Sequence, residues 1–153
     1  LFGWYLLKAG MIGVNRSAGG RTLIDITKRA AEEIRRGRQL LIFPEGTRRP
    51  VGAPPAYRNG VSLMYGAAGV PCIPVALNSG LFWPRRTFLR YPGTLVLEFL
   101  DPIPPGLPRD EFTARLQAVI EEASNRLEKA GREEQVRLIG FSAPIADSAA
   151  DQE

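Results

Sequence analysis

Histidine is absent from all 153 residues of this sequence. Its absence excludes Ser-His-Asp and Cys-His nucleophile systems, and any histidine general base, within these residues. Cysteine occurs once, as Cys72, so an internal disulfide is excluded, and without a Cys/His cluster the usual zinc frameworks are excluded too. We therefore expect no metal site, and we find no obvious nucleophile or base for catalysis within this sequence.

Long hydrophobic segments are also missing. The longest apolar run, residues 1–7, is interrupted by Gly3 and is far shorter than the ~18 residues needed to cross a bilayer. The sequence opens on Leu1 with no charged segment ahead of an apolar stretch, so it does not begin like a signal peptide. We expect no membrane-spanning segment here, and we expect the sequence to be part of a longer chain.

The composition is that of one globular domain, with 44% hydrophobic and 24% charged residues, but its charge is divided unevenly. Residues 1–100 carry 14 Lys and Arg against 5 Asp and Glu, whereas residues 101–153 carry 6 against 11. The first part is a basic surface suited to phosphorylated small molecules, acidic lipid headgroups or nucleic acid. Arginine supplies 17 of the 20 basic residues, which suits phosphate binding but is equally expected from codon composition.

Hydrophobic periodicity and turn residues predict the secondary structure. The capping-box spacing of Thr22 and Asp25, and Gly131 as a stop, help to define helices at 22–36, 59–68 and 109–130. Short apolar runs predict buried strands at 39–43, 72–77 and 94–100. This order predicts an α/β layered domain with a mostly parallel central sheet flanked by helices. Residues 132–153 lose the periodicity, so we expect a disordered tail there.

The segment Phe43-Pro44-Glu45-Gly46-Thr47-Arg48 lies at the expected carboxyl end of a strand, where ligands bind in open α/β sheets. Gly46 allows close backbone approach, Thr47 offers a hydroxyl, and the Arg48 guanidinium matches a phosphate. Glu45 repels phosphate, so its expected roles are to orient an arginine or to accept a substrate hydroxyl. The alternative is a plain turn with a solvent-exposed ion pair.

The same segment resembles the third motif of the glycerolipid acyltransferases, typified by the 1-acylglycerol-3-phosphate acyltransferase family. Residues 10–16 resemble the second motif, with Asn15 in place of the usual acid, and residues 57–60 resemble the aromatic-basic-glycine segment after the third. Residues 70–75 resemble the fourth, a proline-containing strand. The resemblance covers residues 10–78 and implies an acyltransferase domain over 1–80, completed by a strand and amphipathic helix over 81–131.

What the resemblance implies is transfer of a fatty acyl group to 1-acylglycerol-3-phosphate (lysophosphatidic acid), giving phosphatidic acid. The acyl donor would be a thioester of coenzyme A or acyl carrier protein, used as a co-substrate, with no cofactor required. Matching positions imply that Arg16, Thr47 and Arg48 hold the acceptor phosphate and that Glu45 and Gly46 shape the same pocket. Arg58 matches a basic position that contacts phosphate or headgroup, or else it is a solvated surface arginine.

The family's first motif, HxxxxD, has no counterpart here. Its histidine takes the proton of the acceptor hydroxyl as that hydroxyl attacks the thioester. Asp25 and Cys72 are poor substitutes, because Asp25 is expected at a helix start and Cys72 in a buried strand where its thiol is inert. We expect that the domain is truncated at its N-terminus, that HxxxxD lies upstream of Leu1, and that this chain alone is inactive.

Two other functional classes fit parts of the sequence. One is a non-catalytic module that binds lipid phosphate or a membrane surface, suggested by the aromatic and basic residues of 1–7 and 81–86. The other is nucleic-acid binding, disfavoured because no recognisable module is present. The resemblance and the arginine-rich composition together suggest the cytoplasmic face of a bacterial inner membrane.

Overall fold

The structure, a computed structural model, describes residues 19–84 and 88–142 together with Trp4, Lys8 and Met11. Its element order mixes helices and strands in a single α/β arrangement. In chain order the elements are α2 (Gly19–Arg35), α3 (Asn59–Ala68), β1 (Val75–Leu77), α4 (Ser79–Phe82), β2 (Leu97–Phe99) and α5 (Arg109–Ile139).

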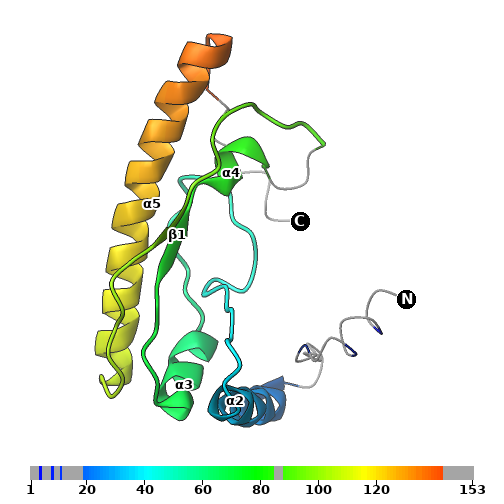
Figure 1. The fold of residues 1–153 in the computed structure, drawn as a ribbon, viewed down its shortest axis with the longest axis vertical. Helices are drawn as coiled ribbons and strands as arrows, with labels where there is room; N and C mark the ends of the chain where they lie inside the picture. The colour runs from blue at the N-terminus through cyan, green and yellow to red at the C-terminus, as the bar shows by residue number, and fades with distance from the viewer. Residues whose placement is uncertain (1–3, 5–7, 9–10, 12–18, 85–87, 143–153) are drawn as a thin grey trace.

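The long helix α5 organises the molecule (Figure 1). Strand β1 lies along α5, and α3 and α4 contact α5 at different levels, while α2 packs beside α3. The main cluster of buried apolar side chains joins α3 to α5 and to the loop after β2, and consists of Val61, Tyr65, Ile103, Phe112 and Leu116. Its rings of Tyr65 and Phe112 stack at 3.7 Å between centroids. The core therefore forms under the amphipathic face predicted for α5.

Helix α3 has the predicted bounds, because Gly69, in the left-handed conformation at φ +65°, ends it as a C-cap. The apolar pattern of 59–68 predicts that Leu63, Met64 and Ala67 face inward, and this prediction is wrong, because the buried residues are Val61, Ser62 and Tyr65. The reason is that α3 faces α2 and α5 at once, and Tyr65 stacks on Phe112.

Helix α2 confirms a helix in the predicted region but begins at Gly19, three residues before Thr22. The capping-box prediction is therefore wrong, since Asp25 is an exposed residue inside the helix rather than part of its first turn. Its apolar face, which includes Ile26, Ala30 and Ala31, is buried. Leu23 approaches α3, where a Cβ on Gly60 would lie 3.5 Å from Leu23 Cδ1.

The predicted strand at 39–43 does not form within the described residues. Leu41 is 77% exposed and Phe43 is 68% exposed, and the segment is irregular. A strand exists only through hydrogen bonds to a neighbour, and no described segment pairs with this one. The apolar composition of residues 39–43 is typical of a strand, but composition does not predict whether a neighbouring strand is there to pair with.

The other two predicted strands form over shorter ranges and pair with each other. Strands β1 and β2 are antiparallel, with Val75 opposite Phe99 and Leu77 opposite Leu97, and Cys72 forms an isolated bridge with Ile103. Among the described residues this two-stranded antiparallel pair is the whole sheet. The mostly parallel central sheet is therefore not confirmed, and β1 begins only after the buried Pro74, which has no N–H to donate.

Helix α5 runs nine residues past the predicted end at 130 and ends at the C-cap Gly140. Gly131 is a buried residue inside the helix rather than its stop, because it packs against Leu81 and Phe82. Residues 132–139 are therefore helical, which corrects the start expected for the tail, and residues 143–153 lie outside the described part. In the part of the chain that the structure describes, no helix combines the length and the apolar character needed to span a bilayer.

Candidate active site

The Pro44–Arg48 segment forms a turn closed by backbone hydrogen bonds. The Gly46 N–H donates to the Phe43 carbonyl at 3.0 Å, and Gly46 has a φ of +69°, a left-handed conformation that glycine adopts without strain. A Cβ at Gly46 would lie 3.6 Å from Arg58 Cγ. The turn thus lies in ordinary van der Waals contact with the aliphatic part of Arg58, and the close approach of a ligand to the Gly46 backbone stays a prediction.

The Glu45 carboxylate holds the turn through contacts to two other parts of the loop. Its Oε1 accepts a hydrogen bond from the Ala56 N–H at 3.4 Å and lies 3.7 Å from Arg49 Nε. One carboxylate oxygen therefore connects the start of the turn to the chain returning toward α3 and also holds an arginine. The arginine that pairs with Glu45 is Arg49, which the sequence reading did not single out, and this partly exposed pair also fits the alternative of a plain turn with a solvent-exposed ion pair.

Positive charge gathers around this carboxylate. Arg58 is the residue before α3, and its N–H donates to the Pro44 carbonyl at 2.8 Å. The first N–H groups of α3 carry the partial positive charge of a helix N-terminus, and no side chain caps them. Arg58, Thr47 and Arg48 are exposed, and among the described residues Arg48 has neither an ion pair nor a hydrogen bond. An exposed guanidinium beside a glycine turn can bind an anion without first breaking an internal ion pair.

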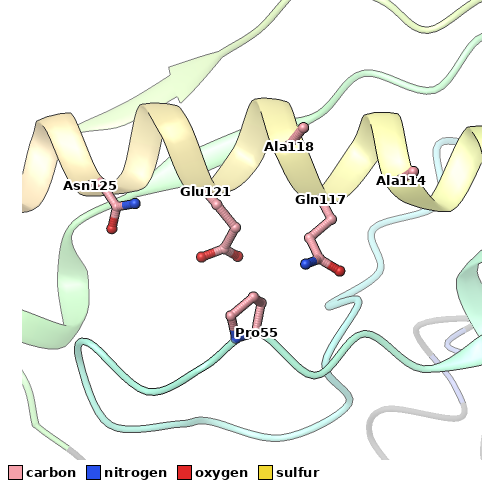
Figure 2. Close-up of a pocket in the computed structure, with 6 residues that line it drawn as sticks. All are labelled: Pro55, Ala114, Gln117, Ala118, Glu121 and Asn125. Atoms are coloured by element: carbon pink, nitrogen blue, oxygen red, sulfur yellow. The ribbon is translucent and has the colours of Figure 1, made fainter.

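The chain returning from the turn is tied to α5. The Tyr57 hydroxyl donates to Glu121 Oε1 at 3.0 Å across 64 residues of sequence. Burial, reinforced by the carboxylates of Glu121 and Glu45, raises the pKa of Tyr57, so its hydroxyl stays protonated. Beside this contact an open pocket of about 480 Å³ separates Pro55 from α5, with Gln117, Glu121 and Asn125 pointing into it (Figure 2).

The structure thus brings together four of the six predicted site residues as one turn, Glu45 to Arg48, and sets Arg58 against it. Arg16, and with it most of the segment resembling a second motif, lies outside the described residues. Arg49 was missed although its spacing of four from Glu45 is a common ion-pair spacing. No sequence signal marks Glu121, because its contact with Tyr57 arises only from the fold.

The segments around Cys72 and around Leu81 contribute to the core. Pro74 is fully buried and Cys72 is half-buried against the main core cluster, so the predicted core role of these residues is confirmed. Burial raises the pKa of the Cys72 thiol, which disfavours the reactive thiolate. Leu81 and Phe82 also belong to the core rather than to an exposed interfacial segment, although Trp83 is 58% exposed.

Comparison with known proteins identifies the family. Residues 1–78, which include the whole Pro44–Arg48 turn and Arg58, match the Acyltransferase family. The chain belongs to the acyltransferase family.

Two relatives of this acyltransferase come from Pseudomonas aeruginosa. A 1-acyl-sn-glycerol-3-phosphate acyltransferase is 38% identical over 94 residues, which are 61% of this chain and 37% of that protein. A lyso-ornithine lipid O-acyltransferase is 31% identical over 138 residues, covering 78% of this chain and 53% of that protein. The acyltransferase chain therefore spans about half or less of the length of the curated relatives that it matches.

A solved structure supports the same fold. The crystal structure of the 1-acyl-sn-glycerophosphate (LPA) acyltransferase PlsC from Thermotoga maritima superimposes with a TM-score of 0.67. The match covers 83% of this acyltransferase chain and 51% of that chain at 21% sequence identity. The α/β fold is therefore similar to that of this solved acyltransferase, and the similarity covers more of the chain than the residues 1–78 that match the family by sequence.

Proposed function

We propose that this chain is part of an enzyme that transfers a fatty acyl group to 1-acylglycerol-3-phosphate in phospholipid biosynthesis. In this reaction the acceptor hydroxyl oxygen forms an ester bond with the thioester carbonyl carbon, and the carbon–sulfur bond breaks. The hydroxyl proton ends on the released thiol of coenzyme A or acyl carrier protein. The products are phosphatidic acid and the free thiol.

The observation that carries this proposal is the Glu45–Arg48 turn, in which one carboxylate holds Arg49 and leaves the Arg48 guanidinium exposed. A phosphate monoester is a suitable ligand for the exposed Arg48 guanidinium and for the N-terminal end of α3. The family match and the 38%-identical acyltransferase support lysophosphatidic acid as the source of that phosphate.

The chain contains no histidine to serve as the general base. We therefore propose that these residues supply acceptor binding and that the base comes from a part of the protein outside the 153 residues. The purified chain should then form no phosphatidic acid from lysophosphatidic acid and an acyl thioester, whereas the product of the complete gene should do so. Mass spectrometry of the lipid products tests both statements, and turnover by the chain alone would show that another group is the base.

A second acceptor has a specific observation in its favour. The lyso-ornithine lipid O-acyltransferase covers 78% of this chain, a larger share than the phosphatidic-acid-forming relative does. Offering the complete enzyme both acceptors in one reaction separates the two candidates. We expect acylation of lysophosphatidic acid, and exclusive acylation of the lyso-ornithine lipid would overturn the first proposal in favour of the second.

We also propose that the partner surface is a membrane, as a lipid acceptor requires, with the cytoplasmic face of an inner membrane as the location. In support, Phe88 is fully exposed, Leu89 is 56% exposed, and the Arg90 guanidinium lies 4.2 Å from the centroid of the exposed Trp83 ring. Aromatic, apolar and basic groups together favour a bilayer interface. The chain should cosediment with vesicles containing phosphatidic acid, and equal recovery in the supernatant with and without vesicles would contradict this.

A further inference from the structure

Tyr57 is the link between the Glu45–Arg48 turn and the long helix α5. Its hydroxyl donates to Glu121 Oε1 at 3.0 Å, and its ring packs partly buried against the main core cluster. The two residues are 64 positions apart, and Glu121 lies outside the residues 1–78 that match the family. The contact is therefore a tertiary one, made by a helix to which no role in the site has been assigned.

The residues on either side of Tyr57 hold the turn. The Ala56 N–H donates to Glu45 Oε1, and the Arg58 N–H donates to the Pro44 carbonyl at 2.8 Å. Tyr57 shares a planar peptide unit with the Arg58 N–H, and the Ala56 N–H lies one peptide unit before the unit that joins Ala56 to Tyr57. Holding the Tyr57 side chain on α5 therefore restrains the short backbone segment that makes both hydrogen bonds to the turn.

The Tyr57 ring also packs against the core cluster that includes Phe112 and Leu116 of α5, so the hydroxyl adds a polar contact to an apolar one. Just before Tyr57 in the chain, an open pocket lies between Pro55 and Ala114, Gln117 and Ala118 of α5 (Figure 2). The Tyr57–Glu121 hydrogen bond is the polar contact to α5 beside this opening.

The Tyr57 hydroxyl is the donor in this contact. Its ordinary pKa already lies above the physiological range, and burial followed by the Glu121 carboxylate raises the pKa of Tyr57 further, so the phenol is protonated there. A protonated phenol donating to a carboxylate is a charge-assisted hydrogen bond, stronger than one between neutral groups.

We propose that Glu121 is a positioning residue, which holds Tyr57 and thereby keeps the Glu45–Arg48 turn in the conformation that binds the phosphate of the acceptor. Glu121 does not itself contact the ligand. This inference rests on the proposed function, because it assigns a second helix to the same phosphate site.

The test uses three variants and a control in the complete 153-residue chain. Tyr57→Phe removes the donor, Glu121→Ala removes the acceptor, and Glu121→Gln removes the charge while keeping an oxygen that accepts the hydrogen bond. Glu122→Ala is the matched control, because it removes the same charge from the exposed side of the same helix. Each variant is titrated with sn-glycerol 3-phosphate and with inorganic phosphate, and amide exchange is followed by NMR.

We expect Tyr57→Phe and Glu121→Ala each to weaken binding of sn-glycerol 3-phosphate roughly fivefold or more, as is usual for coupled sites. The double variant should be no weaker than either single variant, and Glu121→Gln, which keeps a neutral and weaker acceptor, should lose less binding than Glu121→Ala. In the variants that bind more weakly, the Ala56 and Arg58 amide hydrogens should exchange with solvent faster even without ligand. The free energy of unfolding in urea should change less than the free energy of binding.

Two outcomes overturn the inference. If Glu121→Ala and Glu122→Ala behave alike in binding and in Ala56 exchange, the contact positions nothing. If Glu121→Gln is as defective as Glu121→Ala while Tyr57→Phe binds like the wild type, the charge of Glu121 matters rather than its hydrogen bond to Tyr57. A wild-type chain that binds neither phosphate compound contradicts the proposed function instead, and the amide exchange of Ala56 and Arg58 still reports whether Glu121 holds the turn.

Discussion

At the scale of single residues, Glu45 is the group that gives the site its form. A carboxylate among arginines reduces the attraction for a phosphate, so its presence requires a structural reason. That reason is its pair of contacts to Arg49 and to the Ala56 N–H, which join the two ends of the loop. Glu45 thus stabilises the turn, while Arg48 remains exposed for a ligand.

Cys72 gives a residue-scale prediction about pH. Because burial raises the pKa of its thiol, less thiolate is present at pH 8 than for a cysteine in an unfolded chain. Alkylation of the folded chain by iodoacetamide at pH 8 should therefore be slower than alkylation in urea, and its rate should continue to rise above pH 9. Equal rates in the folded and the urea-unfolded chain would show that the thiol is neither protected nor perturbed.

Single site residues were predictable where the chemistry is local. The identity of Glu45, Gly46 and Arg48 suggested an anion-binding turn. The positive φ of Gly46 and the ion pair of Glu45 show that a turn forms here, and anion binding by it stays a prediction. Sequence could not reveal Glu121, because its partner lies 64 residues away and a glutamate on a helix is ordinarily a solvated residue. Contacts of that kind depend on how the elements pack.

At the scale of elements, α5 is longer than predicted, and the reason lies in one residue, Gly131. Gly131 was expected to end the helix because glycine has a low helix propensity. Here a Cβ at Gly131 would lie 2.8 Å from Leu81 Cδ1 and 3.3 Å from Phe82 Cζ. The glycine is needed for α4 to approach α5, and the helix continues past it to Ile139.

Replacing this glycine should therefore destabilise the protein. Gly131→Ala should lower the free energy of unfolding by about 1–2 kcal/mol, because overpacking against buried Leu81 and Phe82 outweighs the gain in helix propensity. Gly66→Ala in α3 is the matched control, since nothing lies within 4 Å of its added Cβ. That control should raise stability by about 0.5–1 kcal/mol. Urea unfolding measures both changes, and a stabilised Gly131→Ala would contradict the packing described.

Element prediction succeeded where the signal was local and failed where it was not. Helix α3 is bounded by a left-handed glycine that sequence reading recognises, so its limits were predicted correctly. The apolar segment 39–43 has a strand-like composition, but a strand also needs a neighbour, and none of the described residues pairs with it. Hydrophobic periodicity predicts which face of a helix or strand is apolar, but it does not predict which other element packs against that face.

At the scale of the whole molecule, the sheet is covered on one side. Ala76 is buried beside α5, and Glu98 pairs with Arg126 of the same helix. The residues on the opposite face are exposed, with Phe99 at 72% and Leu97 at 52%. No described part of the chain covers these side chains, which is consistent with a chain that spans about half of the solved acyltransferase that it resembles.

The central claim is that the Glu45–Arg48 turn of this acyltransferase binds the phosphate of its acceptor. Calorimetric titration with sn-glycerol 3-phosphate at low ionic strength tests it most directly, comparing the wild-type chain with Arg48→Ala and with Arg115→Ala. The latter is a matched control that removes an exposed arginine from α5. We predict that Arg48→Ala weakens binding by about 1.5–3 kcal/mol while Arg115→Ala leaves it unchanged. Equal affinities for all three proteins would contradict the claim.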